Sequence, residues 1–255
     1  METVGTGVLV WRDGRLVTDS DPRPWRHRTV ADSFLLEDGR ALALHAHRER
    51  FLRTAHDAED FWDAAIEALP RAGIWFPRLE QVLTDEGDGE LRLLLRPAPE
   101  LSVSLVLATA DRDPRTAPEV KGPDLEALAT LRAEAQAAGA DEAVLTSPEG
   151  YVVEGASTCI VWWRGALLCL PPDDLPRVDG VAERALVTAA SALGVEIVCE
   201  HVTPAELDGT EVWALNALHG IRIVTGWIDG PATAELPGRL ALWRRRLDAL
   251  RRPLD

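Results

Sequence analysis

The sequence predicts an α/β (α+β) protein with two domains, a smaller N-terminal α/β domain over residues 1–115 and a larger C-terminal one over residues 116–255. Three observations support this. The length of 255 residues with 46% apolar side chains suits one large domain or two small ones. Segments with strand-like alternation and helix-like spacing follow one another along the chain. A polar, proline-rich stretch over residues 111–123 reads as a linker between two such series.

The N-terminal series has two hairpin signals and two helical segments. Asp13-Gly14 and Asp38-Gly39 each lie between apolar runs, which is typical of tight β-hairpins. The apolar spacing over residues 45–55 and 58–69 predicts helices. Strands are expected over residues 89–96 and 101–110.

The C-terminal series opens with a helix that Asp124 can cap. We then expect strands at 142–148, 151–157, 158–163, 166–171, 195–202, 211–218 and 221–227, and helices at 181–193 and 237–252. The last helix carries an arginine-rich face that a solvated surface explains.

Composition narrows the class of protein. A net charge of −15 and a pI near 4.8 argue against nucleic acid and anionic membranes as partners. No apolar run is long enough to span a bilayer, and the first residues lack the basic region of a signal peptide. Three cysteines without CxxC spacing favour buried thiols in a reducing cytoplasm and no metal site. We therefore expect a cytoplasmic protein that acts on small molecules.

Lys121 is the most informative single residue. The chain has 27 lysines and arginines, and Lys121 is the only lysine among them. A genome that favours arginine codons explains the other 26 but not this exception. A lysine amine can lose its proton and act as a nucleophile, whereas arginine stays charged. Lys121 is thus a candidate catalytic residue, the alternative being a chance survivor on a surface loop.

Other features have the residue types of an anion and cofactor site. Glu154 ends the apolar strand YVVEGAS, as a partner for a protonated ring nitrogen or as an edge-strand residue facing water. Gly180 precedes a helix, so the N–H groups of Val181 and Ala182 can face a phosphate, or the glycine can simply form a turn.

Two further segments complete this set. Asn216, with His219 and Gly220, interrupts a strand and can form a second anion-binding turn or an ordinary strand end. Arg50, in the helical segment HAHRERF, suits either a phosphate ligand or a salt bridge. An amine, a carboxylate and a phosphate cradle together point to pyridoxal 5′-phosphate (PLP) as the cofactor.

The same residues, in this order, resemble the class IV aminotransferases, the fold-type IV group of PLP enzymes. That group includes branched-chain and D-amino-acid aminotransferases and aminodeoxychorismate lyase. The similarity runs from about Asp32 to Gly230 and rests on Lys121, on the segment DEAVL twenty residues later and on Glu154. HAHRERF is similar to the family's H-x-x-R, DGVA to its phosphate turn, and EVWALNAL to its second phosphate loop.

The resemblance implies a two-domain fold whose larger domain is a pseudo-barrel, with the cofactor between the domains and a homodimer as the assembly. It implies that Lys121 binds PLP covalently and later acts as the base, and that Glu154 pairs with the ring nitrogen. The implied phosphate contacts come from Arg50, Val181, Ala182, Asn216 and Ala217, and those to the substrate carboxylate from Ala217 and Leu218.

Several positions depart from the family pattern. Cys159 stands for the usual asparagine, Ala182 and Glu183 stand for Thr and Arg, and Ala217 stands for a frequent Thr. The tyrosine that follows the lysine by five residues in many relatives is absent, since position 126 is a glutamate. The pair Gly122-Pro123 directly after Lys121 is also unusual for the family. Backbone N–H groups do not depend on side-chain type, so they can still bind phosphate.

These features leave three functions open. The first is a PLP-dependent aminotransferase that moves the amino group of a small amino acid to a 2-oxo acid. The second is a 4-amino-4-deoxychorismate lyase, which releases pyruvate and forms 4-aminobenzoate. The third is a binding protein of the same fold that has lost catalysis, an alternative suggested by the departures and opposed by the retention of Lys121.

Overall fold

The protein is described here by a computed structural model, in which residues 7–20 and 24–254 are defined. They form two compact units. Unit 1 contains the chain up to Leu101, the short segment Val120–Pro123 and the chain from Leu250 onward. Unit 2 contains Ser102–Glu119 and Asp124–Ala249. Lys121 therefore belongs to unit 1, whereas the sequence placed it in a domain over residues 116–255.

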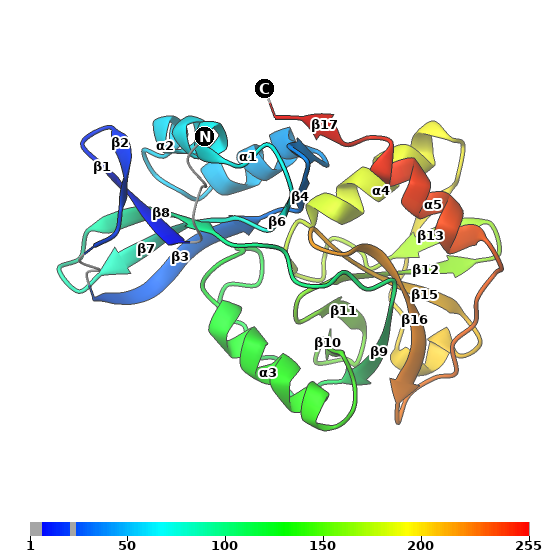
Figure 1. The fold of residues 1–255 in the computed structure, drawn as a ribbon. Coiled ribbons are helices and arrows are strands. Elements are labelled where there is room, and N and C mark those ends of the chain that lie inside the picture. The colour runs from blue at the N-terminus through cyan, green and yellow to red at the C-terminus, as the bar shows by residue number, and fades with distance from the viewer. Residues whose placement is uncertain (1–6, 21–23, 255) are drawn as a thin grey trace. The chain divides into compact units, whose positions relative to one another are not determined.

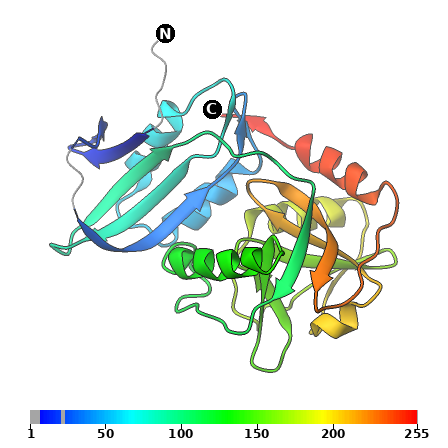
Figure 2. The same cartoon turned by 60° about the horizontal axis from the view of Figure 1, so that its bottom comes forward.

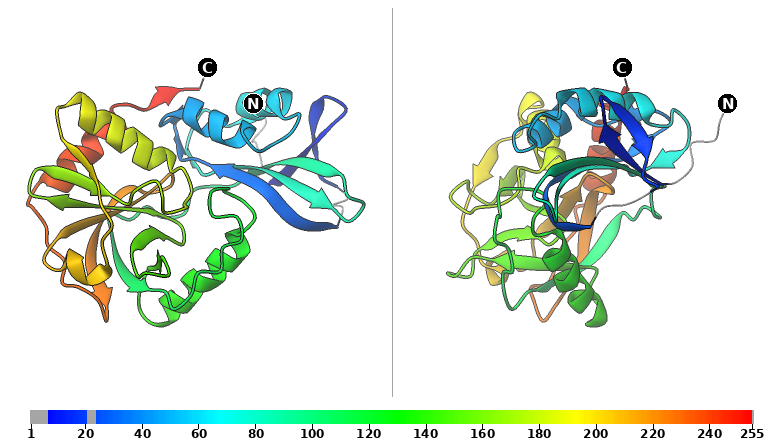
Figure 3. Two further views of the ribbon diagram at one scale, coloured as in Figure 1. Left: turned by 180° about the vertical axis from the view of Figure 1, so that it is seen from behind. Right: turned by 90° about the vertical axis from the view of Figure 1, so that its left-hand side faces the viewer.

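Unit 1 is built on an antiparallel five-stranded sheet (Figure 1). The strand order is β2-β1-β8-β7-β3. Their bounds are β1 (Gly7–Arg12), β2 (Arg15–Thr18), β3 (Trp25–Ser33), β7 (Arg78–Thr84) and β8 (Gly89–Leu95). A helical pair, α1 (Leu44–Leu52) and α2 (Glu59–Ala68), lies over one face of this sheet (Figure 3).

The core of unit 1 lies between these helices and the sheet. It is rich in aromatic residues, with Phe34, Phe51, Phe61 and Trp62 fully or almost fully buried. A second small sheet has the order β17-β5-β4-β6, from β4 (Leu36–Glu37), β5 (Arg40–Ala41), β6 (Ile74–Trp75) and β17 (Arg252–Pro253). Leu254, which follows β17, is part of the same core.

Unit 2 is built on a curled, mixed eight-stranded sheet that forms a half-barrel. The strand order is β11-β10-β9-β16-β15-β12-β13-β14. Their bounds are β9 (Ser104–Thr109), β10 (Glu142–Thr146), β11 (Val152–Gly155), β12 (Cys159–Arg164), β13 (Leu167–Leu170), β14 (Ile197–Cys199), β15 (Glu211–Asn216) and β16 (Gly220–Ile228). Strand β9 pairs in parallel with both β10 and β16.

The helices of unit 2 cover this sheet. Helix α3 (Leu125–Ala137) packs through Leu131 and Ala135 on β10, beside β9 (Figure 2). The other helices are α4 (Val181–Ala192) and α5 (Arg239–Asp248), which contact β15 and β16 respectively, and a 3₁₀ turn η1 (Pro204–Leu207). A separate apolar cluster of this unit includes Leu107, Ile160 and Trp162.

Local signals in the sequence predicted many of these elements. The two Asp-Gly pairs form tight hairpins, with positive φ at both residues of each pair. The predicted helices at 45–55, 58–69 and 181–193 correspond to α1, α2 and α4. Strands β3 and β7 were missed. Asp124 does precede α3, but its carboxylate does not cap the helix.

Candidate cofactor site

Lys121 is anchored in unit 1 through its backbone. The Lys121 carbonyl accepts a hydrogen bond from the Ala31 N–H of β3 at 2.7 Å. The next residue, Gly122, has φ +152°, and a Cβ atom there would lie 2.6 Å from the Val30 Cα. Only glycine fits so close to the strand. The glycine after the lysine, which is unusual for the family, is therefore explained by the docking of this segment on β3.

A buried cluster of Asp32, His47 and Arg50 lies in the same unit. Asp32 Oδ1 lies 2.7 Å from His47 Nδ1, and Asp32 Oδ2 accepts from Arg50 Nε at 2.8 Å. Arg50 Nη2 also donates to Asp32 Oδ1, at 3.0 Å. This two-pronged contact fixes the plane of the guanidinium. Arg50 thus forms a salt bridge, which is one of the two roles that the sequence suggested for it. Its phosphate contact stays a prediction.

The charges of this cluster reach Lys121. Burial would raise the pKa of Asp32, but His47 and Arg50 outweigh that effect and lower it from 3.8 to about 2. Burial lowers the pKa of His47, and the positive charges of Arg50 and Lys121 act in the same direction. Lys121 therefore lies within electrostatic range of His47. Asp32 was not predicted as a site residue. The one feature of the sequence that could have indicated it is an acidic residue close to the apolar residues Val30 and Ala31.

A second group that the sequence did not reveal is an arginine-rich patch on unit 1. Arg28 pairs with Glu80 at 2.7 Å, and Arg96 Nε donates to the Phe76 carbonyl at 2.7 Å. Burial lowers the pKa of Arg96 to about 10, and Arg78 and Arg28 lower it further against the opposing effect of Glu80. Crowded, half-buried guanidinium groups of this kind can bind a carboxylate or phosphate.

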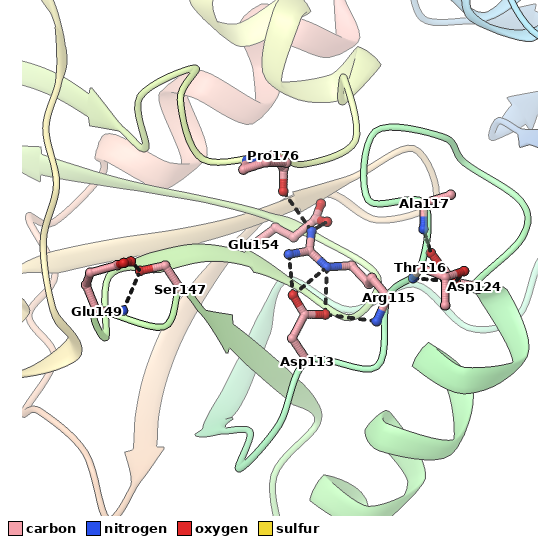
Figure 4. Close-up of polar contacts among 9 residues, drawn as sticks. All are labelled: Asp113, Arg115, Thr116, Ala117, Asp124, Ser147, Glu149, Glu154 and Pro176. Atoms are coloured by element: carbon pink, nitrogen blue, oxygen red, sulfur yellow. Dashed lines mark hydrogen bonds and ion pairs between the residues drawn. The ribbon is translucent and has the colours of Figure 1, made fainter.

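In unit 2, Glu154 ends β11 and is buried (Figure 4). Its Oε1 lies 2.6 Å from Arg115 Nη1, and the two side chains are only 7% and 5% exposed. Arg115 also binds Asp113, through Nη2 at 2.6 Å and Nε at 2.9 Å, and it donates to the Pro176 carbonyl. Glu154 does lie on an edge strand, but the expectation that it faces water in that setting is wrong, because its carboxylate faces a guanidinium.

The segment that carries Arg115 is ordered by Asp124. The Asp124 carboxylate accepts the N–H groups of Thr116 and Ala117, each at 2.9 Å, and the Thr116 hydroxyl at 2.7 Å (Figure 4). Burial would raise the pKa of Asp124, but these backbone donors lower it. The first part of the stretch interpreted as a linker, residues 111–119, is thus a hydrogen-bonded loop of unit 2.

The predicted phosphate turn lies at the start of α4. Gly180 precedes the helix, and no side chain caps the first turn, which begins with the buried residues Val181 and Ala182. A Cβ atom on Gly180 would collide with Cys159 Sγ, so the glycine and the cysteine fit together as a pair. Uncapped N–H groups at a helix N-terminus suit an anion.

Glu183 is the residue of this turn that fits a phosphate least well. It is buried in the first turn of α4 and pairs with Arg177 at 3.2 Å. Burial raises the pKa of Glu183 despite the opposing effect of Arg177, which favours the uncharged acid. Both residues line a cavity of about 350 Å³ in unit 2. Because the acid is paired and its charge is disfavoured, the start of α4 still suits a phosphate.

The second predicted anion turn has a partner of its own. Asn216 Oδ1 accepts the N–H groups of Leu218 and His219, at 3.2 and 2.8 Å. Gly220 follows with φ +67° and allows the tight turn into β16. The Leu218 amide expected to face the substrate is therefore bonded within the turn, while Ala217 lies half-buried at its tip.

The residues present fit PLP within each unit. Unit 1 supplies one amine, Lys121, and the guanidinium of Arg50, and unit 2 supplies a buried carboxylate, Glu154, and the uncapped start of α4. Within the described residues, no group of three or more His, Cys, Asp or Glu side chains is arranged to hold a metal. No helix in the described chain is long and apolar enough to cross a membrane.

Comparisons with known proteins agree with the predicted family and fold. No curated protein matches the chain. A branched-chain aminotransferase from Thermoproteus uzoniensis, solved with norvaline, is 20% identical, with 98% of this chain and 100% of that one covered and a TM-score of 0.84. A hypothetical aminotransferase from Mycobacterium tuberculosis in its PLP-bound form is 20% identical, with 96% and 98% covered and a TM-score of 0.80.

A third neighbour is the branched-chain amino acid aminotransferase from Escherichia coli, which is 14% identical over 96% of this chain and 94% of that one, with a TM-score of 0.80. These likenesses confirm the predicted fold-type IV architecture. The sequence model of the family described as Amino-transferase class IV matches residues 29–227. The chain therefore belongs to the class IV aminotransferase family.

Proposed function

We propose that this protein is a PLP-dependent aminotransferase that moves the amino group of a small amino acid to a 2-oxo acid. The observation that carries the proposal is in unit 1. The only lysine of the chain is docked on β3 and lies within electrostatic range of His47, and Asp32 binds both this His47 and Arg50. PLP is the cofactor of this family.

The residues of unit 1 have distinct roles in the proposal. The Lys121 amine would hold the cofactor aldehyde covalently, and the same amine would take and return the proton at the substrate Cα. Arg50 binds the phosphate, and Asp32 sets the direction of its guanidinium.

The residues of unit 2 have further roles in the proposal. Glu154 pairs with the protonated ring nitrogen. Val181 and Ala182 at the start of α4, together with Asn216 and Ala217, contribute phosphate contacts, largely through N–H groups. Ala217 and Leu218 lie next to the substrate carboxylate. When bound, PLP supplies an electron sink for the negative charge that develops at the substrate Cα.

The lyase remains the second candidate, and the turn after β15 favours it. There Asn216 organises the segment Asn-Ala-Leu by accepting two N–H groups. Both reactions begin with proton removal at the same carbon, so the residues named above serve either one. The two activities differ in the product: new amino acid, or pyruvate and 4-aminobenzoate.

Covalent trapping tests the shared part of the proposal. The purified protein is loaded with PLP and reduced with borohydride, which makes a lysine link permanent, and the labelled peptide is identified by mass spectrometry. We expect one label, on Lys121, and none in Lys121→Arg, which keeps the charge but not the nucleophile. Arg112→Lys is the matched control, since it adds a lysine at an exposed site nearby without creating a labelled one. Failure to label Lys121 would overturn the proposal.

A donor screen then separates the two reactions. We expect the loaded protein to convert amino acids to 2-oxo acids, read as conversion of PLP to its amine form. Release of pyruvate from aminodeoxychorismate without amino transfer would select the lyase.

We further propose a homodimer in the cytoplasm, in keeping with the resemblance and with the three free cysteines Cys159, Cys169 and Cys199. Light scattering of the purified protein tests the dimer.

A further inference from the structure

Arg115 is the direct partner of Glu154 and has no role in the proposed function so far. Its Nη1 donates to Glu154 Oε1 at 2.6 Å and to the Pro176 carbonyl at 3.0 Å. Nε and Nη2 are directed to Asp113, so every nitrogen of the guanidinium has an acceptor. This set of contacts fixes Arg115 in position and orientation.

The pair is too well buried to be an ordinary surface salt bridge. The side chains of Arg115 and Glu154 are 5% and 7% exposed, and a buried carboxylate stays charged only if a cation or several donors compensate it. A guanidinium keeps its charge at any pH at which the protein is folded. Arg115 is therefore a permanent stabiliser of the ionised form of Glu154.

Two other acids maintain this arrangement. Burial opposes the charge on Arg115, but Asp113 and Glu154 more than offset it and raise the pKa of Arg115. Asp124 holds the Thr116 and Ala117 amides immediately after Arg115. The hydrogen bonds of the loop thus hold Arg115 in the position in which it pairs with Glu154.

We propose that Arg115 is a positioning residue that keeps Glu154 ionised and oriented, and so keeps the proton of the cofactor–carboxylate pair on the ring nitrogen. This rests on the proposed role of Glu154. A carboxylate without Arg115 has a higher proton affinity, and in a buried site the neutral pair of carboxylic acid and unprotonated ring becomes favoured. Arg115 opposes that transfer because it lies against the carboxylate.

The test is the protonation state of the ring nitrogen, read by nitrogen NMR of protein loaded with ¹⁵N-labelled PLP. In Arg115→Gln we expect the signal to move from the protonated toward the unprotonated position, and the cofactor dissociation constant to rise. Arg115→Lys keeps a cation and should show most of the wild-type signal. This variant also provides a test if Arg115→Gln does not fold. Arg112→Gln, which removes an exposed arginine paired with Glu134, is the matched control and should leave the signal unchanged.

The variant Glu154→Gln separates the proposed role of Glu154 from that of Arg115. If Glu154 faces the ring nitrogen, this variant shifts the signal by itself, and adding Arg115→Gln changes nothing further. A signal that Glu154→Gln leaves in place overturns the assigned role of Glu154 and, with it, this inference. A signal that moves in Glu154→Gln but stays in place in Arg115→Gln overturns the role of Arg115 alone.

Discussion

Gly122 lies so close to Val30 that a Cβ atom at position 122 would be 2.6 Å from the Val30 Cα. We expect Gly122→Ala to cost about 1–3 kcal/mol in the free energy of unfolding, because the segment has to move away from β3. The Lys121–Ala31 backbone bond lies in the same segment, so covalent trapping of PLP should fall as well. Chemical denaturation and borohydride labelling measure the two effects. Gly150→Ala is the control: its φ is also positive, but no atom lies within 4 Å, so it should lose only about 1 kcal/mol and keep its labelling.

Asp32 is fully buried and binds both His47 and Arg50. We expect Asp32→Asn to cost about 3–5 kcal/mol of stability, because it leaves Arg50 buried without its carboxylate. The dissociation constant for PLP should rise at the same time, since the Arg50 guanidinium loses its fixed direction. Titration with PLP and urea denaturation test this. In Asp63→Asn, an exposed acid paired with Arg48 is removed, and the change should stay below about 1 kcal/mol. Equal effects in the two variants would contradict the prediction.

Acid should destabilise the protein in two steps. The pKa of His47 is below its ordinary 6.5 in the folded state, so its contribution is complete above pH 6.5 and is lost as the pH falls below that value. The pKa of Asp32 is about 2 against an ordinary 3.8, a difference worth ~2 kcal/mol, and this contribution is lost as the pH falls from about 4 to 2.

The measurement is the free energy of unfolding between pH 7.5 and 4.5. His219, whose pKa burial and then Arg222 lower to about 4, contributes with the same sign, and this contribution is lost as the pH falls from about 6.5 to 4. We expect His47→Gln to flatten the curve between pH 6.5 and 4.5, and His219→Gln to flatten it further. A curve of unchanged slope in both variants would show that other groups control acid stability.

Asp124 binds two backbone amides of the loop that presents Arg115. Asp124→Ala leaves these N–H groups without an acceptor, so we expect a loss of about 1–3 kcal/mol and faster hydrogen exchange at Thr116 and Ala117. Asp124→Asn keeps one acceptor oxygen and should show an intermediate rate. Exchange rates that do not change in the alanine variant would mean that the loop is ordered by other contacts.

The sequence predicts structures that depend on adjacent residues, but not those that depend on contacts between residues far apart in the chain. The hairpins at Asp13-Gly14 and Asp38-Gly39 depend on the φ preferences of two adjacent residues, and both were predicted. Strand β3 was missed because its first half, Trp25-Arg-His-Arg, is largely exposed and lacks an apolar pattern. Only its pairing with β7, about fifty residues later, makes it a strand.

The candidate site shows the same limit. Lys121 and Glu154 were predicted as site residues from residue type and spacing, because their chemistry is rare in their surroundings. Their partners were not: Asp32 reaches Arg50 across 18 residues, and Arg115 reaches Glu154 across 39. The loop after β9 looked like a linker because its order comes from side-chain hydrogen bonds of Asp124, which composition does not reveal.

The piecewise make-up of unit 1 has a consequence for engineering. Its core needs Leu254 from the end of the chain, and β17 completes a sheet whose other strands lie before residue 76. The segment with Lys121 is a third piece, inserted between two stretches of unit 2. A fragment that stops at residue 115 would therefore lack both the closing strand and the reactive amine. To isolate this half, one would have to splice its three pieces through new short connections rather than truncate the gene.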